Sequence, residues 1–146
     1  MTAPDLEAFL HANIPLSRAM GVTVAECGDR FVLTAPLAPN INHLGTAFGG
    51  ALHTLPTLAC YAALWTVLRD AGLDGHVVVK RSSAHYRRPV TGALRAVCAR
   101  PSAEAAAGFL ADVRRHKKAR MDLTAVVEGT AGKPAVEYEG CFVALV

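Results

Sequence analysis

Two adjacent glycines, Gly49 and Gly50, lie near the start of the longest apolar segment of the chain, residues 47–68. Because glycine has no Cβ, a ligand can approach its backbone closely, and the first amides of a helix carry about half a positive charge. Such amides can hydrogen-bond to a polarised carbonyl oxygen, which is the chemistry of an oxyanion hole. Alternatively, the glycines only allow the helix to pack tightly against a sheet.

The same segment carries a row of polar side chains. His53, Thr57 and Tyr61 follow one another at intervals of four residues, which places them on one face of a helix. This row can hold a water molecule, with His53 as the proton acceptor, because the unperturbed pKa of histidine is about 6.5. Thr57 can orient a water but cannot take its proton at neutral pH. The alternative is that His53 and Thr57 satisfy buried polar partners.

The loop that precedes the glycines contains Asn42 and His43. Asn42 either donates its side-chain amide to a ligand or a water, or caps the loop, as asparagine commonly does. Both interpretations remain open at this point. We interpret His43 as a loop residue.

The sequence predicts no covalent nucleophile and no metal site. It has no Gly-x-Ser-x-Gly motif, and Ser82 and Ser83 have no acid close in the sequence. The 4 cysteines form no Cys-x-x-Cys pair and have no histidine at zinc-finger spacing. We therefore expect reduced, mostly buried thiols, and neither a metal ion nor a resident cofactor.

Two basic clusters, Arg87-Arg88 and residues 114–120, can contact phosphate groups. We expect the second cluster to be mostly solvated surface. With 15 Lys and Arg against 12 Asp and Glu, the net charge of +3 is too small for the dense basic face of a nucleic-acid-binding protein. The charge therefore favours small anions rather than nucleic acid as partners.

Hydrophobic periodicity and turn residues predict six strands and one long buried helix. The expected elements are a short helix after Pro4, strands 22–27 and 30–35, the long helix, strands 77–88 and 93–100, a helix over 102–113, and strands 120–128 and 134–145. We expect strands 77–88 and 93–100 to pair as a hairpin. A curved sheet of about six strands around one helix is an α+β architecture. Since this helix is apolar on nearly every side, it also favours a homo-oligomer.

The 146 residues correspond to a single domain, 1–146. Segment 47–68 approaches the length of a membrane span, but His53, Thr54, Pro56 and Thr57 interrupt it, so we expect a helix buried inside the protein and no membrane span. The N-terminal residues lack the basic and then apolar pattern of an export signal, so we expect a cytoplasmic location.

Two motifs resemble those of a known family. Residues 42–52, NHLGTAFGGAL, resemble the N-x-x-G-T-x-[HF]-G-G-a signature of hotdog-fold acyl-CoA thioesterases, and residues 84–92, AHYRRPVTG, resemble the Y-x-R-P-v-x-G strand exit of the same fold. The nearest branch is the family typified by the YiiD C-terminal domain, which shares the wording N-I-N-H-x-G-T-x-F-G-G. The resemblance extends along nearly the whole chain.

The resemblance implies a hotdog fold and a thioesterase of fatty acid metabolism that hydrolyses acyl-CoA or acyl-carrier-protein thioesters, with coenzyme A only as part of the substrate. It also implies a homodimer or homotetramer with its site at the subunit interface. Taken together with the residue patterns above, the candidate catalytic residues are Asn42, Gly49, Gly50, His53 and Thr57, and the candidate substrate contacts are Phe48, Tyr86, Arg87 and Arg88.

The chain departs from the family pattern at two positions. Many thioesterases of this fold have His at the position of Phe48 and an acid at that of Thr57. The usual general base is therefore missing. This keeps a non-catalytic acyl-CoA-binding or accessory domain as the alternative function. Dehydration or hydration of an acyl thioester ranks lower, because it needs a histidine and an acid across the site.

Overall fold

The computed structural model describes residues 1–146 as one six-stranded sheet with four α-helices. The helices are α1 (Ala3–Asn13), α2 (Pro15–Ala19), α3 (Gly49–Asp70) and α4 (Ala103–His116). The strands are β1 (Thr23–Cys27), β2 (Arg30–Ala35), β3 (His76–Tyr86), β4 (Leu94–Ala99), β5 (Lys118–Glu128) and β6 (Pro134–Leu145), with short 3-10 turns η1 (Ala38–Asn40) and η2 (Thr130–Gly132). The predicted order of helices and strands is confirmed, with α2 as an addition.

The sheet is antiparallel throughout, in the order β1-β2-β4-β5-β6-β3. The predicted hairpin between strands 77–88 and 93–100 is wrong. β3 pairs with β6 at one edge, whereas β4 lies between β2 and β5. The residues between β3 and β4 run from the edge of the sheet, where β3 lies, to its interior, where β4 lies, and do not form a tight turn between neighbouring strands. Turn residues such as Pro89 and Gly92 mark the end of a strand, but they do not select its partner.

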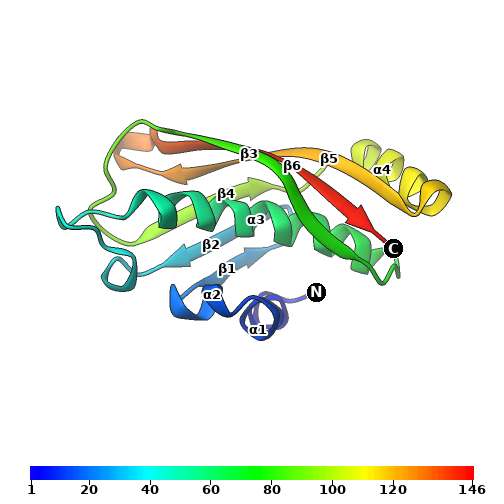
Figure 1. Ribbon diagram of the computed structural model, residues 1–146, viewed down its shortest axis with the longest axis horizontal. Coiled ribbons are helices and arrows are strands. Elements are labelled where there is room, and N and C mark those ends of the chain that lie inside the picture. The colour runs from blue at the N-terminus through cyan, green and yellow to red at the C-terminus, as the bar shows by residue number, and fades with distance from the viewer.

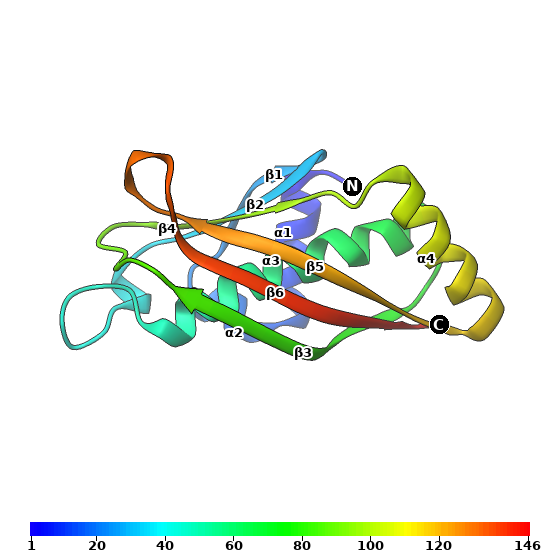
Figure 2. The same cartoon turned by 90° about the horizontal axis from the view of Figure 1, so that it is seen from above.

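Figures 1 and 2 show the sheet curving around α3, with α1 and α2 beside β1 on the side of α3 that the sheet leaves open. The ring of Phe9 in α1 stacks on Trp65 of α3, with centroids 3.8 Å apart. Leu6 and Leu10 of α1 are fully buried. The N-terminal helix therefore completes the cover of the central helix, and the arrangement is the hotdog fold that the resemblance implies.

The central helix α3 is buried along most of its length. It is long and apolar enough to cross a membrane by length and composition, but 78% of its most apolar 18-residue window is buried inside the fold. Its fully buried side chains include Leu55, Leu64 and Leu68. The burial accounts for its apolar composition, as expected for the core helix of an α+β fold.

The inserted helix α4 begins and ends with local signals. Ser102 accepts a hydrogen bond from the amide of Ala105 through its hydroxyl, the predicted N-cap. Lys117 adopts a left-handed conformation with a φ of 61°, which ends the helix and turns the chain into β5. In Figure 1, α4 lies at the opposite end of the molecule from the start of α3.

Candidate functional site

The first amides of α3 are free of intramolecular partners. Phe48 is the N-cap residue and supplies no side-chain cap. The amide of Leu52 makes the first helical bond, to the carbonyl of Phe48 at 3.0 Å. The amides of Gly49, Gly50 and Ala51 have no acceptor within the chain. Three donors therefore remain at the positive end of the helix dipole, where an anionic oxygen is stabilised.

The two glycines differ in their surroundings. A Cβ built at Gly49 would meet only Cε1 of Tyr86, at 3.9 Å, an ordinary contact distance. A Cβ at Gly50 would run into the ring of Phe48, which folds back over the helix start. The Phe48 side chain itself is 58% exposed. The Tyr86 ring therefore lies near Gly49 and the Phe48 ring lies near Gly50, and both residues are predicted substrate contacts.

Asn42 is used by its own loop. Its side-chain NH₂ donates to the Thr46 hydroxyl at 2.8 Å and to the Ala47 carbonyl at 3.4 Å. Its side-chain oxygen accepts from the amides of Leu44 at 2.8 Å and Thr46 at 3.1 Å. The geometry favours the loop-capping interpretation of Asn42 over a direct contact with a ligand.

His53 lies one turn after the glycines and meets residues of β3 and β6. Its Nε2 lies 3.0 Å from the Ser82 hydroxyl, and its Nδ1 lies 3.4 Å from the Tyr86 hydroxyl. The ring of Tyr138 packs edge-on against the imidazole, with centroids 5.3 Å apart and an interplanar angle of 85°. His53 therefore has hydroxyl partners at both ring nitrogens, and no carboxylate bonds to it.

Thr57 continues the same polar group. Its hydroxyl lies 2.8 Å from the carbonyl of His53 and 2.9 Å from the Tyr138 hydroxyl. Tyr138 is 2% exposed, and burial raises the pKa of its phenol, opposed by hydrogen bonds to Thr57 and Ser82. The predicted third member, Tyr61, is half-buried, and burial raises its pKa as well. Thr57 thus has a buried polar partner in Tyr138, whereas the two side-chain partners of His53 are the half-buried Ser82 and the exposed Tyr86.

Sequence reasoning missed Ser82 and Tyr138. Ser82 has no acid near it in the chain, yet the fold brings it to His53 from 29 residues away. Tyr138 comes to Thr57 from 81 residues away. Tyr138 alternates with exposed Glu137 and Glu139 in β6, so its place on the helix-facing side of the sheet could have been inferred. The pairing of Tyr138 with Thr57 could not have been inferred from the strand pattern.

The predicted arginine contacts are engaged elsewhere. Arg87 pairs with Glu137 through two hydrogen bonds, at 3.0 and 3.1 Å, and this guanidinium lowers the pKa of the Glu137 carboxyl. Arg88 donates to the carbonyl of Pro134 at 3.2 Å. The basic cluster 114–120 lies at the end of α4 and the start of β5, mostly exposed and without a carboxylate partner.

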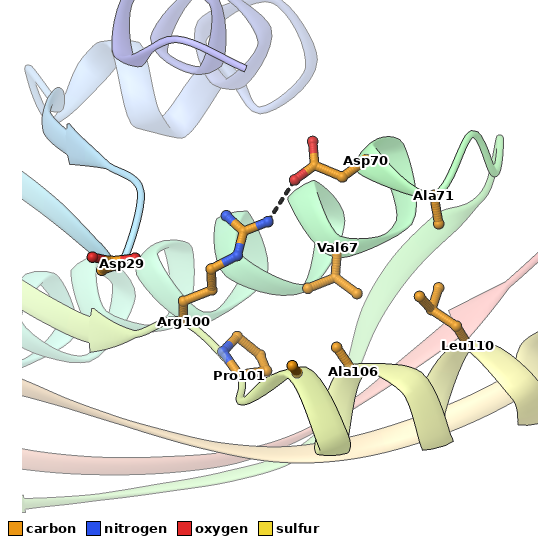
Figure 3. A pocket seen from close by; sticks show the side chains of 9 residues that line it. Asp29, Val67, Asp70, Ala71, Arg100, Pro101, Ala106 and Leu110 are labelled. Atoms are coloured by element: carbon orange, nitrogen blue, oxygen red, sulfur yellow. Dashed lines mark hydrogen bonds and ion pairs between the residues drawn. The ribbon is translucent and has the colours of Figure 1, made fainter.

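A separate cavity of about 600 Å³ lies at the other end of α3. Figure 3 shows it between the end of α3 and helix α4, with Arg100 paired to Asp70 near Pro101, and with Leu110 farther along α4 toward Ala71. The Asp70 carboxylate neutralises the Arg100 guanidinium, so this ion pair leaves no unpaired charge in the cavity. It is remote from the free amides, which lie at the opposite end of α3.

The structure contains no cluster of three or more His, Cys, Asp or Glu side chains that could hold a metal ion. The cysteines are all unpaired, and three of them are buried. The groups gathered at the start of α3 are hydroxyls, one imidazole and backbone amides. Together they can polarise a carbonyl oxygen and accept one proton.

Comparisons with known proteins agree with this fold. Residues 3–146 match the family model described as "Putative thioesterase (yiiD_Cterm)". A protein of unknown function from Chlorobaculum tepidum TLS is 32% identical, with a TM-score of 0.93 over 98% of this chain and 93% of that chain. A "putative thioesterase" from Shewanella oneidensis is 27% identical, with a TM-score of 0.87 over 99% and 97% of the two chains. A Pseudomonas aeruginosa protein described as a "Probable Thioesterase" is 24% identical, with a TM-score of 0.81 over 97% and 95%, and shows the fold.

Proposed function

The chain belongs to the "Putative thioesterase (yiiD_Cterm)" family, and on this premise we propose that it is an acyl thioester hydrolase acting on acyl-CoA or acyl-carrier-protein substrates. The observation that carries the proposal is the set of unpartnered amides at Gly49, Gly50 and Ala51. The missing Cβ at Gly49 leaves space beside its amide for a substrate carbonyl, and the missing Cβ at Gly50 makes room for the ring of Phe48. Donors held in place before the reaction stabilise the developing oxyanion without reorganisation.

The proposed reaction uses His53 as the base. The thioester carbonyl oxygen accepts hydrogen bonds from the amides of Gly49 and Gly50. A water beside His53 attacks the carbonyl carbon as its proton passes to the imidazole, which gives a tetrahedral oxyanion. The C–S bond then breaks, and the imidazole returns the proton to the thiolate. The products are a carboxylic acid and a free thiol.

We propose that Phe48 and Tyr86 contact the acyl thioester, because their rings flank the two glycines. Coenzyme A enters this scheme as part of the substrate, and its phosphates require a cation. Arg88 is exposed and bonds only a backbone carbonyl, whereas Arg87 is neutralised by Glu137. Arg88 is therefore the better candidate of the two for a phosphate contact.

The site also lies beside an unpaired sheet edge. β3 is an edge strand, so one row of its backbone groups has no partner in the chain. Exposed apolar side chains gather on this strand and at the adjoining start of α3, namely Phe48, Val78, Val79 and Tyr86. We propose a homodimer that covers this edge and encloses the site, with a tetramer as a pair of such dimers. Light scattering after gel filtration tests this, and a monomer mass at micromolar concentration would count against it.

The direct test of the activity is hydrolysis of a panel of acyl-CoAs of different chain lengths, and of the same acyl groups on carrier protein, followed by release of free thiol. We expect turnover with at least one chain length. His53→Gln keeps a polar side chain of similar size but cannot serve as the base, and it should lower kcat by roughly 100-fold or more. Wild-type kcat in this variant would contradict the assignment of His53.

The alternative function is a non-catalytic acyl-thioester-binding or accessory domain. The observation in its favour is that hydroxyls, and no carboxylate, surround His53. A binder would show a higher melting temperature with acyl-CoA but no release of thiol from any substrate. We also retain the proposal of a cytoplasmic location, which the unpaired cysteines support.

A further inference from the structure

The Thr57 hydroxyl lies between two other oxygen atoms. It is 2.8 Å from the carbonyl oxygen of His53, one turn earlier in α3, and 2.9 Å from the hydroxyl of Tyr138 in β6. A threonine hydroxyl has one hydrogen to donate, and a carbonyl oxygen can only accept. The hydrogen of Thr57 is therefore directed to the His53 carbonyl, and Tyr138 donates its own hydrogen to Thr57.

This direction of the two bonds limits what Thr57 can do in catalysis. Its one hydrogen is used inside the helix, so Thr57 has none to donate to a substrate or to a leaving group. Its oxygen instead serves as the acceptor for a phenol that is only 2% exposed. A buried hydroxyl without a partner is costly, so this bond holds the end of the Tyr138 side chain against α3.

The ring of Tyr138, held in this way, contacts the imidazole of His53. The two ring centroids are 5.3 Å apart and the planes meet at 85°, a T-shaped arrangement that aromatic pairs favour. The last torsion angle of a histidine side chain has a broad energy minimum, so the neighbours of the ring, and not its rotamer, set its plane. Tyr138 is the aromatic neighbour that does so for His53.

We infer that Tyr138 is a positioning residue that sets the plane of the His53 imidazole, and that Thr57 acts through Tyr138, as the anchor of its hydroxyl, and not on a water. Both roles rest on the proposed function, because they concern the orientation of the proposed base. They also give threonine a task at the position where many thioesterases of this fold have an acid.

The sheet leaves a place for this one large ring. Tyr138 lies opposite Ala84 of β3 on one side and Ala125 of β5 on the other, and both neighbours are small. A Cβ at Gly140 would lie 2.9 Å from the Tyr138 hydroxyl, closer than real Cβ contacts allow. The space for the phenol is therefore built by three small residues, which keeps its hydroxyl within reach of Thr57.

The first test is a double-mutant cycle on kcat. Thr57→Val removes the anchor, Tyr138→Phe removes the hydroxyl that it holds, and each should lower kcat roughly 3- to 10-fold, the equivalent of one net hydrogen bond, with KM unchanged. Because both changes break the same bond, the double variant should lose no more than either single variant. If Thr57 acted on the water itself, the two losses would multiply, and that result would overturn the role assigned to Thr57.

Two further variants separate positioning from a general effect on the helix. Thr57→Ser keeps the hydroxyl and should recover most of the kcat lost in Thr57→Val. Thr54→Val is the matched control, since the Thr54 hydroxyl makes the same kind of bond one turn back, to the carbonyl of Gly50 at 2.8 Å, and bonds no tyrosine. It should keep wild-type kcat. Equal losses in Thr54→Val and Thr57→Val would assign the effect to the helix and contradict the role of Tyr138.

The second test needs no turnover. The ring current of Tyr138 shifts the ring protons of His53 in the NMR spectrum, and these signals are identified among those of the 6 histidines by their loss in His53→Gln. We expect Thr57→Val to move them toward their positions in Tyr138→Leu, which lacks the ring. Unchanged His53 signals in Thr57→Val would overturn the anchoring role even if kcat falls. The expected shift in a protein that hydrolyses no thioester would support the positioning of His53 and refute only the proposed function.

Discussion

The substitution Gly49→Ala separates the role of the free amide from the role of glycine in packing. The added methyl would meet only Cε1 of Tyr86, at 3.9 Å, so the fold has space for it. In a helix, the Cβ is tilted toward the N-terminus, which places it beside the open amides. The methyl therefore crowds a carbonyl oxygen that approaches the helix start without disturbing the helix itself.

The expected effects on stability and activity have opposite signs. Replacing glycine by alanine where the backbone and the space permit it raises the free energy of unfolding by about 0.4 to 1 kcal/mol. For a chain of this size, that is a rise of roughly 1 to 4 °C in the melting temperature. Loss of an oxyanion donor typically costs about 100- to 1000-fold in kcat. Because the methyl crowds the donor and does not remove it, we expect a loss of about 10- to 100-fold.

The assay is thiol release from the best acyl-CoA substrate together with thermal unfolding. Gly108→Ala is the matched control, because Gly108 is exposed within α4, where an added Cβ would meet nothing within 4 Å. It should gain similar stability and keep wild-type kcat. Full activity of a stable Gly49→Ala variant would refute the role of the amide. A large loss of its stability would instead favour the packing interpretation of Gly49.

Three further predictions concern stability. Arg87 lowers the pKa of Glu137 from 4.5, so their ion pair stabilises the folded chain at neutral pH, and this stabilisation is lost as the pH falls below 4.5. The melting temperatures of Glu137→Gln and the wild type should therefore differ at pH 7 and converge in acid. A difference that stays constant with pH would contradict this. Burial raises the pKa of Tyr138 above 10.0, so its contribution to the free energy of unfolding is complete below pH 10.0 and is lost as the pH rises through the higher folded value. Absorbance at alkaline pH should show Tyr61 and Tyr138 ionising later than Tyr86, and Tyr138→Phe should remove one tyrosine from the late phase; an unchanged late phase in that variant would contradict this. Leu64→Ala empties a fully buried position in α3 and should lower the free energy of unfolding by about 2 to 5 kcal/mol in urea titrations, whereas a loss below about 1 kcal/mol would place Leu64 outside the core.

The sequence alone predicts the six strands, the helices α1, α3 and α4 and the glycine-containing start of α3, but not the short helix α2. Periodicity, capping residues and turn residues act over a few neighbours, so the Ser102 cap, the β1-β2 hairpin and the long central helix can be predicted from short windows. The position of Gly49 and Gly50 at the start of the central helix can be predicted for the same reason. That its amides have no acceptor also depends mainly on local structure, since a helix cannot satisfy its own first amides.

Only the tertiary structure decides which side chains meet. The partners of β3, of Asn42 and of His53 each had more than one possibility in the sequence, and the hairpin expected for β3 was wrong. Ser82 and Tyr138 reach His53 and Thr57 across 29 and 81 residues, through the pairing of β3 with β6 in which Ser82 lies opposite Gly140. Strand register places every side chain of a sheet at once, and it is set by the packing of the whole core against α3. Local sequence therefore supplies the free amides at the start of α3, while the packed sheet brings the hydroxyls of Ser82, Tyr86 and Tyr138 to His53 and Thr57.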